Sequence, residues 1–284
     1  MVGFSPLGVV VRVRVKGEDT GRESRMSPSI TDALAGPGWV RLPFDPAVLA
    51  WVRAALPLAT KAIAAPDGDW RCGGTWFPGV DALPNDEAGA VAGVPLPESL
   101  RSPLPIRVGQ WHRAQLSALR PGYPRPDPDE SEAAFRFRRD RDAAHVDGVL
   151  AIGPLKRRMI REPHGFILGL PLTEADPGAA PLVVWEGSHE ILRRAFAAAL
   201  APHPPATWPE IDLTEVYQAA RREVFATCRR VALAARPGEA LLLHRLILHG
   251  MAPWADGAEA DPLGRVNAYF RPELPSAEDW ITRP

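Results

Sequence analysis

Short hydrophobic runs separated by Pro or Gly dominate the chain from residue 106 onward. They occupy residues 106–111, 165–170, 181–185, 231–235, 240–245 and 265–270. Runs of this length, rich in aliphatic and aromatic residues, are typical of β-strands. The pattern predicts a mainly β protein, built as one β sandwich with helices at its periphery.

Three other segments have the pattern of helices. Asp45 followed by Pro46 is a typical helix start, with Asp as the N-cap and Pro at the first helical position. Residues 190–200 and 214–228 have apolar side chains at helical spacing, with Thr214 as the expected N-cap and a proline-rich hinge between the two segments. These patterns predict an N-terminal helical layer and a helical insertion at about residues 190–230.

The domain organisation follows from these elements. We expect one domain over residues 26–284, with loops and short elements over 65–105, where Pro, Gly, Trp and Asp follow no clear period. Residues 1–25 are predicted to be an N-terminal extension, either poorly ordered or containing a short edge strand over residues 9–16. No apolar run approaches the roughly 20 residues that a membrane helix needs, so no membrane association is expected.

Composition narrows the classes of function. The chain of 284 residues has 33 basic and 34 acidic residues, a formal net charge of −1, which argues against a nucleic-acid partner. Three of the basic residues are lysines and 30 are arginines, whose guanidinium groups bind carboxylates and phosphates in a bidentate geometry. Cys72 and Cys228 are too few for a disulfide framework, so we expect reduced thiols and a cytoplasmic protein.

The candidate chemistry starts from the tripeptide His145-Val146-Asp147. If this segment is extended, the imidazole and the carboxylate project to the same face. His249, in the segment Leu248-His249-Gly250, is the best candidate for a third ligand. Two imidazoles and one carboxylate on one side of an ion form the facial triad of non-haem Fe(II) oxygenases. A His-x-Asp tripeptide is common by chance, however, and a surface turn capped by the Asp is the alternative interpretation.

The surrounding motifs carry a resemblance to a known family. The His-x-Asp tripeptide is followed in order by Gly187-Ser188-His189, Gly238-Glu239 and His249-Gly250. This order resembles the phytanoyl-CoA dioxygenase-like family of Fe(II)/2-oxoglutarate oxygenases over about residues 106–272. One departure is Glu239, where the family usually has Asp.

The resemblance implies a fold, cofactors and site residues. The fold is the double-stranded β-helix, a jelly roll, and the cofactors are Fe(II) and 2-oxoglutarate. His145, Asp147 and His249 become the iron ligands. The family also places an Arg on a late strand to bind the far carboxylate of 2-oxoglutarate. Arg265 fits this role although its distance from His249 is somewhat long, and Arg271, on the same face of the same strand, is the alternate. Asn267 faces the same way and is expected to add a hydrogen bond; a surface position on an edge strand is the alternative for both arginines.

The activity implied is hydroxylation of a C–H bond of a small molecule, with conversion of 2-oxoglutarate and O₂ to succinate and CO₂. Related halogenating enzymes replace the carboxylate ligand by a small residue, so the presence of Asp147 favours hydroxylation. The alternatives are a non-catalytic jelly-roll protein that binds a metal or 2-oxoglutarate, and a cupin-like metal-dependent enzyme. The sequence leaves the substrate and the oligomeric state open.

The remaining histidines and arginines have weaker interpretations. His189 is expected to be structural, and His244 to be a core histidine and the fallback ligand. His164 is a candidate for lining the pocket. Arginines at 136, 138, 139 and 141, and at 157, 158 and 161, flank the His-x-Asp tripeptide; they form either a solvated face or a lip that recruits an anionic substrate. Trp70, Trp76 and Trp111 are candidates for an apolar pocket wall.

Overall fold

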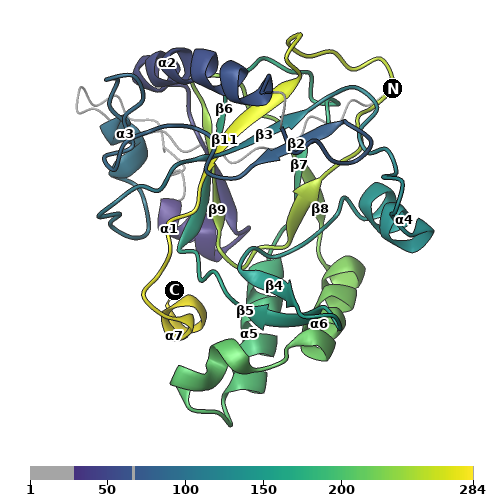
Figure 1. Ribbon diagram of the computed structural model, residues 1–284. Helices are drawn as coiled ribbons and strands as arrows, with labels where there is room; N and C mark the ends of the chain where they lie inside the picture. Colours follow the sequence, from purple (N-terminus) through teal and green to yellow (C-terminus); the bar gives the residue numbers. More distant parts are fainter. Residues whose placement is uncertain (1–28, 66–67, 284) are drawn as a thin grey trace, which may run out of the picture.

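The strands of the computed structural model form antiparallel sheets with helices on both sides (Figure 1). The structure describes residues 29–65 and 68–283, so the predicted extension over residues 1–25 lies outside the described residues. The largest sheet has six strands, in the order β1 (Trp39–Leu42), β9 (Ala240–His244), β6 (Phe166–Pro171), β11 (Arg265–Phe270), β3 (Gln115–Leu119) and β2 (Trp76–Gly79).

A second sheet has three strands, in the order β10 (His249–Met251), β7 (Leu182–Trp185) and β8 (Arg230–Leu233). A separate hairpin pairs β4 (Val149–Ile152) with β5 (Arg157–Ile160). From β6 onward the chain crosses repeatedly between the two larger sheets, because β6, β9 and β11 belong to the first, and β7, β8 and β10 to the second. The structure therefore confirms antiparallel sheets with peripheral helices; no ladder of hydrogen bonds joins the two larger sheets within the described residues.

The two larger sheets face each other across an apolar core. One buried cluster contains Ile167, Leu243 and Tyr269 from the six-stranded sheet, and Leu182 and Val184 from the three-stranded sheet. Side chains alternate between the two faces of a strand, so the neighbouring residues point outward. Both faces of these strands are apolar because helices pack on the outward faces as well.

Helices cover the two outward faces. The 18-residue α2 (Pro46–Ile63) packs Trp51 and Val52 onto the six-stranded sheet. Asp45 caps this helix as predicted, since its Oδ1 accepts a hydrogen bond from Ala47 N at 2.7 Å. The outward face of the three-stranded sheet packs against α5 (Ser188–Leu200), α6 (Thr214–Thr227) and α7 (Ala277–Thr282), while η1 (Pro205–Glu210) lies between α5 and α6. The other helices, α1 (Ile30–Ala35), α3 (Glu98–Arg101) and α4 (Glu132–Asp140), are short.

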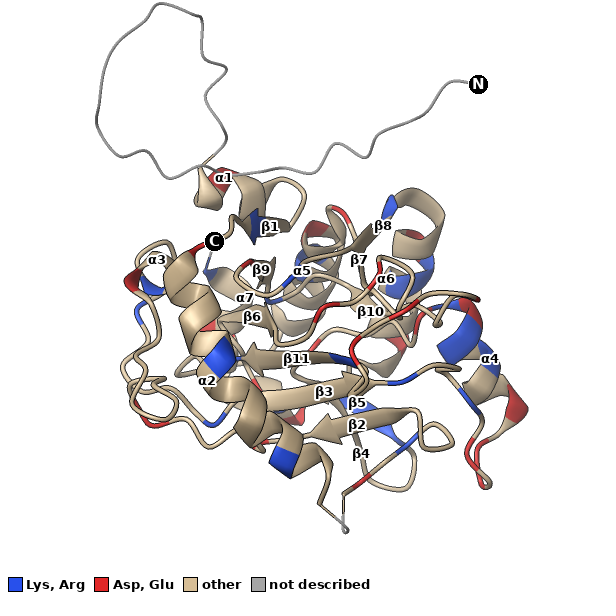
Figure 2. Cartoon of the chain, turned by 90° about the horizontal axis from the view of Figure 1, so that it is seen from above, with Lys and Arg blue, Asp and Glu red and all other residues tan. Residues whose placement is uncertain are grey.

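Charged residues are sparse on α2, which carries only Arg53 and Lys61, whereas α4 is strongly charged (Figure 2). Among the helices that the structure describes, α2 is the one whose length and mean hydropathy of 1.2 would suffice to cross a membrane. Core helices of globular proteins meet the same criterion, and the buried side of α2 packs on the sheet.

Two local predictions are wrong. The strand expected over residues 106–111 is irregular, and the nearest strand is β3. The apolar residue Trp111 serves the core without a strand: its ring packs edge-on against Phe166 and Phe270, at ring distances of 6.5 and 5.0 Å. Thr214 is the first residue of α6 and not its N-cap. Asp212 accepts the hydrogen bond from Thr214 N at 2.9 Å instead.

Candidate metal centre

The backbones of the two histidine segments pair directly with each other. His145 N donates to the His249 carbonyl at 2.8 Å, and His249 N donates to the His145 carbonyl at 3.0 Å. His145 forms this single bridge and lies outside any regular strand, whereas His249 is the first residue of β10. In the register of β10 with β7, His249 lies opposite Val184, so its side chain enters the space between the sheets.

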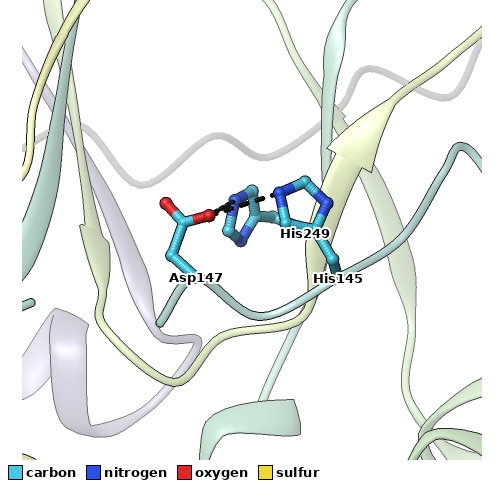
Figure 3. A group of neighbouring side chains, drawn as sticks. All are labelled: His145, Asp147 and His249. Carbon is cyan, nitrogen blue, oxygen red and sulfur yellow. Dashed lines mark ion pairs between the residues drawn. The ribbon is translucent and has the colours of Figure 1, made fainter. Parts of the chain in front are cut away.

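The side chains of His145, Asp147 and His249 converge on one point (Figure 3). Asp147 Oδ1 lies 3.3 Å from His145 Nε2 and 3.7 Å from His249 Nε2. One potential ligand atom from each residue lies within 4.8 Å of the other two. Among the described residues this is the one group of His, Cys, Asp and Glu that could hold a metal ion, and its donor set suits Fe(II).

Backbone carbonyls orient both imidazole rings. His145 Nδ1 lies 3.0 Å from the Ala143 carbonyl oxygen, and His249 Nδ1 lies 3.0 Å from the Ile247 carbonyl oxygen. A carbonyl can only accept, so each Nδ1 carries the proton. In the neutral imidazole each Nε2 then keeps its lone pair on the side of Asp147, the arrangement that metal-binding histidines adopt.

Charge and burial favour the protonation states that a metal needs at two of the three residues, Asp147 and His249. Burial raises the pKa of Asp147, but the charges and hydrogen bonds of His249, His145 and Arg271 outweigh it and hold this pKa well below its usual range. Burial lowers the pKa of His249 to about 4 although Asp147 opposes the shift. At neutral pH the site therefore presents an ionised carboxylate beside a neutral imidazole at His249.

Residues between β7 and β8 hold both ligand segments in place. Tyr217 on α6 is buried, and its phenol oxygen accepts a hydrogen bond from Val146 N at 3.0 Å. Ser188, at the start of α5, accepts a hydrogen bond on Oγ from Leu248 N at 2.9 Å. Sequence reasoning singled out the Gly-Ser-His turn but not this role of Ser188, and it missed Tyr217. No local signal in the sequence marks Tyr217, because its partner lies 71 residues away.

Close packing of the backbone explains the glycine after His249. A Cβ atom at Gly250 would lie 2.1 Å from the carbonyl oxygen of Asp142 and 3.2 Å from Ala144 Cα. Asp142 is itself held by Arg230, whose Nε and Nη2 each donate to its carboxylate at 2.7 Å. The segment before His145 can therefore approach β10 closely only because residue 250 has no side chain.

A cavity of about 150 Å³ opens beside the three ligand atoms. Its apolar lining includes Ile167, Leu182, Leu243 and Met251, and its polar lining includes Gln115, Ser117, Tyr269 and Arg271. Trp76 is part of this wall, whereas Trp111 packs in the outer core and Trp70 stacks with Arg120. The cavity lies between the two larger sheets, on the open side of the triad.

The two predicted anchor arginines occupy different positions, and Arg271 lies one residue beyond the end of β11, not on the strand as predicted. Arg271 lines the cavity, and its Nη1 lies 3.3 Å from Asp147 Oδ2. Arg265 is 9% exposed and does not line the cavity directly; its Nη1 contacts Met251 Sδ at 3.6 Å, and Met251 does line it. No carboxylate pairs with Arg265 within the part of the chain that the structure describes.

Asn267 connects Arg265 to the cavity wall. In the amide orientation that satisfies all its neighbours, Asn267 Oδ1 accepts from Arg265 Nη2 at 2.8 Å and from the Tyr269 hydroxyl at 2.8 Å. Arg265, Asn267 and Tyr269 alternate along β11 and share its inward face, as predicted for Arg265 and Asn267. Arg265 is thus held in a defined orientation by neutral partners.

The other candidate residues lie away from the triad. His189 and His244 stack on each other with ring centroids 4.5 Å apart, and His244 Nδ1 accepts from Leu246 N at 3.1 Å. Arg157 and Arg161 pair with Asp212 and Glu210, at 3.5 and 3.0 Å. Arg138 and Arg139 pair with Glu130 and Asp140. None of these arginines lines the cavity at the triad.

Comparison with known proteins gives structural likeness only. No protein-family model and no curated protein matches the chain. Among solved structures, the non-haem α-ketoglutarate-dependent carbocyclase SnoK from nogalamycin biosynthesis is similar, with 15% identity, coverage of 93% of this chain and 92% of that chain, and a TM-score of 0.48. EctD from S. alaskensis (16% identity, coverage of 86% and 76%, TM-score 0.42) and the α-ketoglutarate-dependent epimerase SnoN (13% identity, coverage of 85% and 80%, TM-score 0.41) are also similar.

Independently of these comparisons, the described residues bring the predicted His-Asp-His triad together. At these scores the likeness does not assign a reaction, which depends on the residues of this chain.

Proposed function

We propose that this protein is an Fe(II)/2-oxoglutarate-dependent oxygenase that hydroxylates a C–H bond of a small molecule. The observation that carries the proposal is the convergence of His145 Nε2, His249 Nε2 and Asp147 Oδ1 beside a cavity that leaves one side of the triad open. The order in which the chain alternates between the two facing sheets supports a double-stranded β-helix as the fold.

Arg265, which is separated from the cavity by Met251, is the proposed partner of the far carboxylate of 2-oxoglutarate. A buried guanidinium without a carboxylate partner is costly, and an anionic ligand would remove that cost. Arg271 is less suited because its guanidinium already pairs with Asp147. Ile167, Leu182 and Leu243 suit the methylene groups that separate the two carboxylates of 2-oxoglutarate.

Bound Fe(II) would supply the activation of O₂ coupled to oxidative decarboxylation of 2-oxoglutarate to succinate and CO₂. The residues of the chain orient and enclose the reactants. Arg271 holds Asp147 Oδ2, so that Oδ1 faces the two imidazoles. The apolar walls exclude water from the cavity, which protects a reactive centre from side reactions.

Hydroxylation is proposed over halogenation because a carboxylate, Asp147, completes the triad. A protein that binds a metal or 2-oxoglutarate without turnover has the same donor set, and the two functions differ in succinate formation. The cytoplasmic location and the nature of the substrate stay predictions.

The test combines metal binding with turnover. Wild-type protein loaded with Fe(II) and ascorbate is expected to form succinate from 2-oxoglutarate, and His145→Ala to lose both Fe(II) binding and succinate formation. His203→Ala, at an exposed turn, is the matched control and should retain both. Equal Fe(II) affinity in His145→Ala and wild type would refute the metal site, and Fe(II) binding without succinate formation would favour the non-catalytic alternative.

A further inference from the structure

A second cavity adjoins the candidate metal centre across one side chain. It has a volume of about 480 Å³, and Arg271 lines both this cavity and the smaller one at the triad. Glu162 is near the metal-binding segment as well, because Glu162 N and Arg161 N both approach the carbonyl of Gly148, the residue that follows Asp147. A molecule in this cavity would therefore lie one side chain from the proposed metal ligands.

The charged groups around this outer cavity are mostly carboxylates. Asp81, Glu162 and Glu273 line it, and among the described residues Arg271 is its one guanidinium, already paired with Asp147 at 3.3 Å. His112 adds no positive charge at neutral pH, because burial lowers its pKa. The lining thus has an excess of negative charge that an anionic substrate would not neutralise.

Polar groups in the wall are incompletely satisfied. His164 is 5% exposed, and its Nε2 lies 3.2 Å from Glu162 Oε2, while its Nδ1 has no hydrogen-bond partner in the described part of the chain. Arg271 Nε also lacks a partner there, but it can only donate, so an ammonium group would not satisfy it and only His164 Nδ1 counts toward such a ligand. Buried polar groups are nearly always hydrogen-bonded in folded proteins, and a missing ligand is one explanation for such exceptions.

We propose that the outer cavity binds the substrate to be oxidised and that this substrate is a small molecule with an ammonium group, held by Glu162 and Glu273. Arg271 forms the boundary between this group and the metal centre. The orientation of the substrate toward the metal rests on the proposed function. The preference of the cavity for an ammonium group does not depend on that function.

The experiment uses Mn(II) as a paramagnetic probe at the triad, with saturating 2-oxoglutarate to occupy the anionic site. Proton relaxation is measured for n-hexylammonium and, as its anionic counterpart, hexanoate, with Zn(II)-loaded protein as the diamagnetic reference. Hexylammonium is expected to relax faster than hexanoate. In the double variant Glu162→Gln, Glu273→Gln the relaxation enhancement of hexylammonium should fall about 5-fold, since two partly exposed ion pairs are removed. Glu98→Gln, an exposed carboxylate on α3, should retain it.

Several results would overturn the proposal: no enhancement for hexylammonium, an equal or larger enhancement for hexanoate, or an enhancement unchanged in the double variant. Failure of the proposed function is distinguishable, because Mn(II) would then not bind or would bind equally to His145→Ala. In that case calorimetry of hexylammonium binding to wild type and the double variant still decides whether the cavity prefers an ammonium group.

Discussion

Tyr217 holds the backbone between two proposed metal ligands: its phenol oxygen accepts a hydrogen bond from Val146 N at 3.0 Å, in a fully enclosed environment. The tyrosine belongs to α6, in the helical connection between β7 and β8. A helix outside the sheets thereby fixes the segment from which His145 and Asp147 project.

Tyr217→Phe removes this acceptor without emptying the core. An unsatisfied buried N–H costs about 1–3 kcal/mol, so the unfolding free energy should fall by that amount. Loss of groups that orient ligands commonly weakens metal binding about 10-fold or more, and Co(II) titration would measure it. Tyr123→Phe, at a buried tyrosine outside the triad, is the control and should retain Co(II) affinity. Equal loss in both variants would show that Tyr217 has no specific role at the site.

Arg265→Lys tests the proposed anchor for 2-oxoglutarate. Lysine keeps the charge but not the bidentate geometry, so the affinity for 2-oxoglutarate should fall about 10-fold or more. The dissociation constant is measured by calorimetry with metal-saturated protein. Arg271→Lys should lose less, because Arg271 pairs with Asp147. The opposite order of effects would assign 2-oxoglutarate to Arg271.

Gly250→Ala tests the close approach of β10 to the segment before His145. The new Cβ would lie 2.1 Å from the Asp142 carbonyl oxygen, so one of the two segments must move. Overpacking of this kind costs about 1–3 kcal/mol of unfolding free energy. We expect weaker Co(II) binding as well, since the displaced segments carry His145 and His249. Gly109→Ala, where a Cβ meets no atom within 4 Å, should be neutral in both measurements.

Acid should destabilise the protein through His244. Burial, followed by the nearby His189 and Arg245, lowers the pKa of His244 to about 2. The unfolded chain, with a histidine pKa of about 6.5, therefore binds a proton that the folded protein excludes. The stability is fully present above about pH 6.5 and falls as the pH drops below it, by about 1.4 kcal/mol per pH unit for one such group.

Denaturant unfolding at pH 7 and pH 5 tests whether the unfolding free energy falls as the pH is lowered. His244→Asn keeps an acceptor for Leu246 N but cannot take up the proton, so its stability should depend less on pH than that of wild type. An identical pH dependence in both proteins would show that His244 is protonated in the folded state.

Much of the fold was readable from local pattern. The strand over residues 265–270 coincides with β11, and the helix beginning at Pro46 is α2, because apolar alternation and an Asp-Pro start act within a few residues. The strand predicted over 106–111 was wrong because an apolar run does not reveal whether its partner is a strand or, as for Trp111, an aromatic cluster. The short strands β1 and β2 give too few residues for any period to be visible.

The sequence by itself determined which residue types were available for chemistry: a His-x-Asp tripeptide, a distal His-Gly and two arginines six residues apart. These motifs can be recognised from residues close together in the chain and from the two-residue period of a strand. Only the tertiary structure decided that Tyr217 and Ser188 hold the ligand segments and that Arg271 contacts Asp147. It also decided that Arg265 is buried with no carboxylate partner among the described residues. Such relationships join residues far apart in the chain, and they exist only once the sheets have packed and their register is fixed.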